Sequence, residues 1–377
     1  MTTPSPNPHQ PTDAILRALA TTTVAAGFLM AGAANAVQPS IAEARQVVAT
    51  AAQHGAPWHG PQSGPQAQSG KTVVIVAEDL RNGGVVGAAQ GMREAAKVLG
   101  WNIKIMDAGG TAAGRTRALA NALVVSPDGL VLCGSDAIEA NPELTAFTDK
   151  GIPIVGWHAG PAPGPIAGTP VAMNVTTDPL EVARVTAMDA VAQSEGHAGV
   201  VIFTDSRFRI AMAKANAMAA VIRACEGCTV LEMRDVALSD ADAKMPEVTR
   251  DLLQRYGRRW THALAINDVV FDRAVPVLTS AGLQGPSLLS AGDGSAAAFL
   301  RIQARTFQTG TVAEPLNQRG WQALDELNRL FAHQPASGFA APVHLVTSDN
   351  IAFDGGPRLQ YDPDNGYREI YRRIWQR

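Results

Sequence analysis

Five short polar clusters follow apolar runs of this chain, and they contain residue types that can bind polyhydroxy compounds. Carboxylates accept several hydrogen bonds, amides donate and accept, and an indole offers a flat apolar face. Taken singly, Asn82 and Asp205 could instead cap helices. Together the clusters predict a binding cleft. They are Glu78-Asp79 with Asn82, Trp157-His158, Asp205-Ser206-Arg207, Asn267-Asp268 and Gly292-Asp293-Gly294-Ser295.

The apolar runs alternate with segments of helical spacing, which predicts sheets of parallel strands with helices on both faces. The expected strands are 72–77, 101–106, 129–133, 152–157, 199–204, 229–233, 260–266 and 287–291. The expected helices are 85–99, 115–125, 141–150, 207–224, 244–256 and 270–281. Such sheets bind ligands beyond the carboxyl ends of their strands, where the polar clusters fall. The fold class is therefore predicted as α/β, with two successive doubly wound, Rossmann-like lobes.

The first thirty-six residues have the features of an export signal. Ala18 to Gly32 is almost uncharged, Arg17 precedes it, and Ala34-Asn35-Ala36 has the small-x-small pattern of a cleavage site. The apolar run is shorter than the roughly 20 residues that a spanning helix needs, which favours a removed signal over an uncleaved anchor. We expect an exported, periplasmic protein without access to ATP, nicotinamide or nucleic acid.

Composition indicates a globular protein with an ample core, since 46% of the residues are hydrophobic and 17% are charged. A net charge of −3 provides no basic surface for nucleic acid. Residues 37–70 are expected to form a helix over Ile41–Ala52 and then a linker rich in Gly, Pro, Gln and Ser. His54 and His59 in this linker lack a nearby carboxylate, so we expect no metal site there.

A glycine motif and a cysteine pair each allow a functional and a purely structural interpretation. Gly83-Gly84-x-x-Gly87 follows a strand, but its first spacing differs from that of a dinucleotide fingerprint. Cys225 and Cys228 have the spacing of a metal or redox pair, but no second ligand pair exists. In an oxidising compartment we predict a small structural disulfide between them, the alternative being two free thiols.

From Lys71 onward the chain resembles the periplasmic sugar-binding proteins of ABC transporters, the ribose-binding, type I family. The resemblance is carried by several motifs in combination: Ala77 to Gly84, Gly91-x-x-x-Ala95-Ala96-x-x-Leu99-Gly100, Gly151 to Val155, Ile266 to Asp268, Ser290 to Gly294, Thr311 to Pro315, Gly320-Trp321, Leu324-x-Glu326-Leu327 and Asp362 to Tyr367. It implies two lobes joined by three crossovers near 174–175, 314–315 and 343–347. The expected lobes are 71–174 with about 315–345, and 175–314 with about 346–377.

The resemblance also implies ligand contacts. Asn82, Lys214, Asn267, Asp293 and Glu314 stand at the family's binding positions. Gly84 and Val85 replace the adjacent aromatic residues that stack on the sugar, and His158-Ala159 replaces an Asp-Arg pair, which points to a different sugar or an acyclic polyol. The full set expected to bind the ligand is Glu78, Asp79, Asn82, Trp157, His158, Arg207, Lys214, Asn267, Asp268, Asp293 and Glu314.

The function predicted from sequence is capture of a neutral sugar or polyol between two lobes and its delivery to a membrane permease. We expect a monomer with no catalytic residue, no cofactor and no nucleic-acid partner. Two alternatives stay open at this point: an exported glycoside-processing enzyme that uses Glu78 and Asp293 as paired carboxylates, and a sensory protein that presents the same ligand to a membrane receptor.

Overall fold

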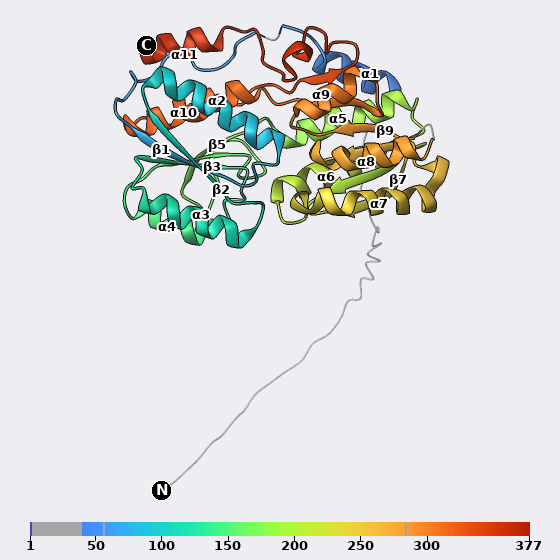
Figure 1. The fold of residues 1–377 in the computed structure, drawn as a ribbon, viewed down its shortest axis with the longest axis horizontal. Coiled ribbons are helices and arrows are strands. Elements are labelled where there is room, and N and C mark those ends of the chain that lie inside the picture. Colours follow the sequence, from blue (N-terminus) through green and yellow to red (C-terminus); the bar gives the residue numbers. More distant parts are fainter. Residues whose placement is uncertain (2–39, 56, 283–284) are drawn as a thin grey trace, which may run out of the picture. The chain divides into compact units, whose positions relative to one another are not determined.

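A computed structural model describes Met1 and residues 40–55, 57–282 and 285–377 (Figure 1). Apart from Met1, the expected export signal at 1–36 lies outside the described residues. Within the described part of the chain, no helix combines the length and the hydropathy needed to cross a membrane.

The first sheet is wholly parallel, with the strand order β2-β1-β3-β4-β5. Its strands are β1 (Thr72–Ala77), β2 (Asn102–Asp107), β3 (Gly129–Cys133), β4 (Ile154–Trp157) and β5 (Val171–Val175). Residues 73–77 are fully buried because alternate side chains of β1 enter cores on opposite faces. One face is covered by α2 (Gly83–Leu99), α10 (Leu316–Phe331) and α11 (Tyr367–Trp375), and the other by α3 (Ala112–Val124) and α4 (Asn141–Thr148).

The second sheet has the order β11-β10-β9-β8-β6-β7, and only β11 runs antiparallel to its neighbour. Its strands are β6 (Gly199–Thr204), β7 (Thr229–Asp235), β8 (His262–Ala265), β9 (Ser287–Ser290), β10 (Gln308–Val312) and β11 (Leu345–Thr347). One face is covered by α1 (Ile41–Ala51), α5 (Pro179–Gln193) and α6 (Arg209–Ala224), and the other by α7 (Ala241–Tyr256) and α8 (Val269–Ser280). A smaller cluster packs α9 (Ala296–Gln303) against β11 and the loop beyond it.

The chain passes between the two lobes close to the expected crossovers. Residues 176–178 join β5 to α5, residues 313–315 join β10 to α10, and residues 332–344 join α10 to β11. The third crossing therefore comes earlier in the chain than the expected 343–347, because β11 already occupies that stretch.

Both terminal segments add further crossings that the sequence analysis did not expect. Helix α1 packs on α5 in the second lobe, whereas Ala67 at the end of the linker belongs to the core of the first lobe. Helix α11 lies against α10 in the first lobe, so the expected assignment of 346–377 to the second lobe is wrong for this helix. The reason is its aromatic face: Trp375 stacks on Trp321 with ring centroids 5.2 Å apart.

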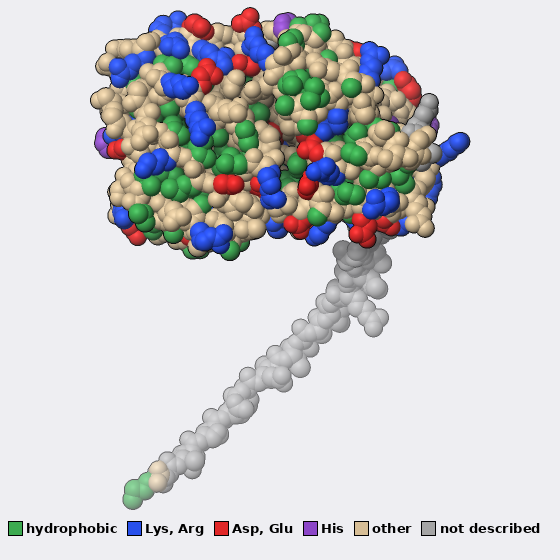
Figure 2. Space-filling view, viewed as in Figure 1, with side chains coloured by type: hydrophobic (Ala, Val, Ile, Leu, Met, Phe, Trp, Pro, Cys, Tyr) green, Lys and Arg blue, Asp and Glu red, His purple; other side chains and the backbone are tan. Residues whose placement is uncertain are grey.

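Charged side chains of both signs are interspersed over the visible face of the molecule (Figure 2). Lys and Arg side chains do not gather into a basic patch on that face.

Candidate functional site

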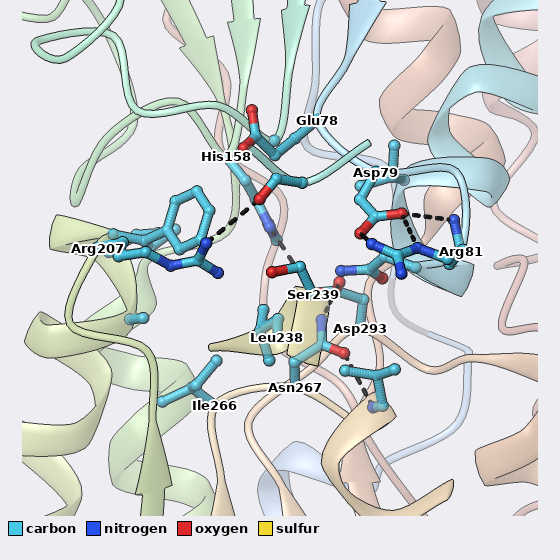
Figure 3. Close-up of a pocket in the computed structure, with 18 of the residues that line it drawn as sticks. Glu78, Asp79, Arg81, His158, Arg207, Leu238, Ser239, Ile266, Asn267 and Asp293 are labelled. Atoms are coloured by element: carbon cyan, nitrogen blue, oxygen red, sulfur yellow. Dashed lines mark hydrogen bonds and ion pairs between the residues drawn. The ribbon is translucent and has the colours of Figure 1, made fainter. Parts of the chain in front are cut away.

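A cavity of about 310 Å³ lies between the lobes, at the carboxyl ends of the strands (Figure 3). The first lobe contributes residues that follow β1, β3 and β4. The second lobe contributes the start of α6 and the loops after β7, β8 and β9. The topology explains this position, because parallel strands of an open α/β sheet all direct their following loops to the same edge.

Two carboxylates after β1 face the cavity and are held by arginines. Glu78 accepts a hydrogen bond from the hydroxyl of Ser135, and Nη1 of Arg115 lies 3.4 Å from both of its oxygens. Burial raises the pKa of Glu78, and Ser135 and Arg115 offset part of that shift. Asp79 accepts from Nε and Nη2 of Arg81 at 2.9 and 2.6 Å. Both carboxylates are therefore fixed before any ligand enters.

Asn82 and Gly84 shape the entrance of α2. The side chain of Asn82 caps the helix by accepting from the backbone N–H of Gly84 at 2.9 Å. Gly84 is required by a close approach, since a Cβ there would lie 2.1 Å from Oδ2 of Asp293 in the other lobe. The aromatic residue that the family resemblance places at this position would therefore displace Asp293.

Asp293 is the polar centre of the second lobe's contribution. It is 4% exposed, and its Oδ2 accepts from Nδ2 of Asn267 at 2.8 Å. Nδ1 of His158 lies 3.7 Å from its Oδ1. Burial raises the pKa of Asp293, while His158 and Lys214 act in the opposite direction. One carboxylate oxygen is thus oriented by Asn267, and the other faces the imidazole.

Lys214 brings a buried ammonium group to the same end of the cavity. It is 4% exposed, and its Nζ donates to the carbonyl oxygen of Ala291 at 2.6 Å. Among the ion pairs of the described residues, none involves Lys214. An ammonium carries three N–H donors, so this side chain can still donate to ligand oxygens.

The aromatic and apolar wall of the cavity differs from a site in which a sugar ring stacks between two aromatic side chains. Trp157 is buried, and His158 stacks on it with ring centroids 4.1 Å apart and planes 9° apart. One face of the indole is therefore covered by the protein itself. Phe208, Leu238 and Ile266 supply apolar surface from the second lobe.

Arg207 connects the lobes at the rim of the cavity. Its guanidinium makes a two-point contact with Asp205 at 2.9 and 2.6 Å, and its Nη1 donates to the carbonyl oxygen of Gly110 in the first lobe at 3.2 Å. Asp205 also accepts from the backbone N–H of Leu238. It therefore orders two loops of the second lobe and does not cap α6, in contrast to the alternative considered from sequence.

Comparison with known proteins places this geometry in a family. Residues 73–335 match the model of the periplasmic binding protein domain. The chain belongs to the periplasmic binding protein family. Among curated proteins, none matches the chain.

Solved structures of this family have the same fold. An ABC sugar transporter subunit from Rhodobacter sphaeroides is 22% identical, with a TM-score of 0.64 over 75% of this chain and 99% of its own. A solute-binding protein from Agrobacterium vitis with bound allitol is 18% identical, with a TM-score of 0.64 over 76% and 98%. A sugar ABC transporter protein from Yersinia enterocolitica is 15% identical, with a TM-score of 0.69 over 82% and 95%.

The family assignment confirms the predicted type I α/β fold and makes the chain a binding protein rather than an enzyme. It also indicates a location outside the cytoplasm. Within the described ranges, no group of His, Cys, Asp and Glu side chains could hold a metal ion. The expectation that no carboxylate lies near His54 is wrong, because its Nδ1 lies 2.5 Å from Oδ1 of Asp354, whose Oδ2 lies 3.0 Å from Nε2 of His344.

The cavity of this periplasmic binding protein brings together most of the residues expected from sequence. Those that line it are Glu78, Asp79, Asn82, Trp157, His158, Arg207, Lys214, Asn267 and Asp293. Sequence reasoning missed Phe208, Leu238 and Ser239. Phe208 lies inside the helix expected at 207–224, and Leu238 and Ser239 follow the strand expected at 229–233. Single residues at such positions do not stand out in a sequence.

Two expected ligand contacts do not line the cavity. Asp268 is fully buried and accepts from the backbone N–H groups of Gly294 and Ser295 at 2.8 and 3.0 Å and from Nε2 of Gln308 at 2.9 Å. It therefore holds the loop that carries Asp293. Glu314 lies behind His158, with Oε1 3.5 Å from its Nε2.

The environment of Glu314 explains how a carboxylate can be buried there. Burial opposes its ionisation, but Arg319, which donates at 2.7 Å, and His158 hold the pKa of Glu314 well below its ordinary value. Glu314 thus faces the ligand site only through His158.

Of the three cysteines, Cys133 lies beside the cavity, since its carbonyl oxygen accepts from the backbone N–H of Glu78 at 2.9 Å and the next residue, Gly134, lines the cavity. Cys225 and Cys228 form a disulfide at the end of α6, and Cys133 is buried at the end of β3. The pairing agrees with the expectation from their spacing, and none of the three lines the site.

Proposed function

We propose that this protein captures a neutral sugar or polyol between its lobes and delivers it to the permease of an ABC transporter. The carrying observation is the buried set of Asp293, Asn267 and Lys214 beside an apolar wall in one cavity between the lobes. Relatives of the same fold are described with bound allitol, tagatopyranose and glycerol. These ligands all carry several hydroxyl groups on a short carbon skeleton.

The chemistry of the cavity suits such a ligand. Each hydroxyl both donates and accepts, so neighbouring hydroxyls can donate to Asp293 and accept from Lys214. A hydrogen bond to a charged group contributes roughly 1.5–3 kcal/mol. The carbon skeleton can pack against Phe208 and Leu238. Since His158 covers one face of Trp157, a flat ring sandwiched between aromatic side chains is not the favoured ligand, which supports a small sugar of another shape or an acyclic polyol.

The proposal includes export with removal of residues 1–36, residence in the periplasm, and action as a monomer. Intact-mass analysis of protein purified from the periplasm should give a chain that begins at Val37. A mass that retains residues 1–36 would contradict a cleaved signal.

A thermal-shift screen of the purified protein against hexoses, pentoses, hexitols, pentitols, sugar acids and amino acids tests the function. At about a hundred times its dissociation constant, a ligand adds ~2.7 kcal/mol to the free energy of unfolding, which corresponds to several degrees in the melting temperature. We expect such shifts for one or a few sugars or polyols, and recovery of the ligand unchanged after incubation. Shifts with amino acids alone, or consumption of the sugar, would overturn the proposal.

A further inference from the structure

A carboxylate of the first lobe contacts the first turn of a helix in the second lobe, outside the cavity. Asp136 follows β3, and Arg209 is the first residue of α6. Nε of Arg209 lies 2.9 Å from Oδ2 of Asp136, and Nη2 lies 2.9 Å from Oδ1. The backbone N–H of Arg209 also donates to Oδ2 at 3.2 Å. Neither side chain lines the cavity.

Helix α6 receives this contact in place of a cap of its own. Its N-cap residue is Phe208, which makes no side-chain capping hydrogen bond and instead lines the cavity. The first N–H groups of a helix need acceptors, and a carboxylate there is also favoured by the helix dipole. Asp136 therefore supplies from the opposite lobe what the sequence of α6 lacks.

The carboxylate is positioned within its own lobe. Oδ1 of Asp136 accepts from the backbone N–H of Ile138 at 2.9 Å, and Asp136 is 2% exposed. Arg209 is the more exposed partner, because its side chain is 45% exposed against 2% for Asp136. Separation of the lobes must break all the contacts between Asp136 and Arg209 and leave the start of α6 uncapped.

We propose that Asp136 and Arg209 form a latch that stabilises the closed arrangement of the lobes and so raises ligand affinity without touching the ligand. The affinity arm of this inference rests on the proposed function. A ligand that binds the closed protein has an apparent affinity scaled by the fraction of molecules already closed. Both residues are positioning residues, since they act through the lobe arrangement.

The latch can be tested without any ligand by measuring the distance between the lobes. Nitroxide labels on Val124→Cys in α3 and Ala243→Cys in α7 place one probe on each lobe, at exposed positions. Burial raises the pKa of the Cys133 thiol and the other cysteines are paired, so the introduced thiols react first. We expect Asp136→Asn and Arg209→Gln to reduce the short-distance population.

The matched control is Arg184→Gln. Arg184 makes a two-point contact with Glu181 at 2.7 and 2.7 Å, but both residues belong to α5 and the contact does not cross between lobes. Its distance distribution should equal that of the parent protein. Identical distributions in Asp136→Asn, Arg209→Gln and the parent would overturn the latch.

The affinity arm uses calorimetry and stopped-flow with the sugar or polyol that gives the largest thermal shift. We expect Asp136→Asn and Arg209→Gln each to weaken ligand binding by about 3- to 20-fold, mainly through faster dissociation. The double variant should bind the ligand no less tightly than the single variant with the lower affinity, because both substitutions remove the same contact. Unchanged affinity in both variants would overturn the role in binding. If no sugar or polyol binds the parent protein, the proposed function fails, and the distance measurement still decides the latch.

Discussion

At the scale of single residues, neighbours in the sequence have separate tasks. Asn267 and Asp268 are adjacent, yet Asn267 lines the cavity whereas Asp268 is buried behind it. Sequence analysis located both residues after the predicted strand at 260–266 but could not tell which side chain faces the ligand. That choice depends on where the loop with Asp293 lies, because its N–H groups at Gly294 and Ser295 need the carboxylate of Asp268.

This division predicts that one substitution weakens ligand binding and that another lowers the stability of the fold. Asp293→Ala should weaken binding of the preferred sugar or polyol by about 10- to 150-fold, because a charged acceptor for ligand hydroxyls is lost. Its free energy of unfolding should change little. Asp268→Ala should instead lower the free energy of unfolding by about 2–4 kcal/mol, since three donors, two of them in buried hydrogen bonds, lose their acceptor.

Calorimetry measures the first effect and urea unfolding the second. His158→Ala is an informative companion, because it should change which sugar or polyol binds best rather than how stably the lobe folds. Wild-type affinity in Asp293→Ala would show that the ligand lies elsewhere.

At the scale of secondary-structure elements, the sequence predicts strands and helices whose apolar pattern is clear. It misses elements that are buried on several sides and therefore lack such a pattern. The strand expected at 72–77 is β1, and the helix expected at 207–224 is α6 without its first two residues. Residues 171–193 form β5 and α5, to which the sequence patterns assign no element. Helix α5 buries residues from Val182 to Val191 almost without interruption, so it lacks the polar stripe that identifies a surface helix.

Strand β8 has a titratable residue that makes the second lobe sensitive to acid. His262 is 5% exposed, its Nδ1 lies 2.9 Å from the hydroxyl of Thr261, and its Nε2 has no hydrogen-bond partner among the residues described. Burial lowers the pKa of His262 to about 4. In the unfolded chain a histidine titrates near pH 6.5, so between about pH 6.5 and 4 the unfolded state binds a proton that the folded state does not.

The free energy of unfolding should therefore fall by up to about 3 kcal/mol from this residue as the pH drops through that window. His262→Gln should flatten the pH dependence by that amount in urea unfolding at pH 7, 6, 5 and 4. His59→Gln, at an exposed linker position, is the control and should keep the wild-type dependence. A parallel pH dependence in His262→Gln and the wild type would contradict this role.

At the scale of the whole molecule, the sequence predicts the two-lobe architecture but misplaces the ends. The family model covers residues 73–335, and the segments outside it include α1, the linker and α11. The composition of residues 54–70 predicts only a linker, yet Trp58 packs on Phe339 and Tyr371 with ring centroids 5.0 and 5.5 Å away. Such contacts depend on side chains brought together from both ends of the chain, which local patterns do not reveal.

These terminal segments connect the two lobes in addition to the three internal connections. The linker runs from α1 on the second lobe to β1 in the first, and the C-terminal segment runs from β11 in the second lobe to α11 on the first. Ala67 in the linker donates its backbone N–H to the carbonyl of Trp375 at 3.1 Å, so the linker also bonds to the C-terminal helix. Any movement of the lobes must be accommodated by these segments as well as by residues 176–178, 313–315 and 332–344.

The central claim is that a hydroxylated ligand binds in the cavity between the lobes, and a crystal structure of the protein with the best sugar or polyol from the screen tests it most directly. The account predicts ligand density in the cavity, with ligand oxygens about 2.7–3.2 Å from a carboxylate oxygen of Asp293 and from Nζ of Lys214. Ligand density at another place, with the cavity between Glu78 and Asp293 free of it, would contradict the account.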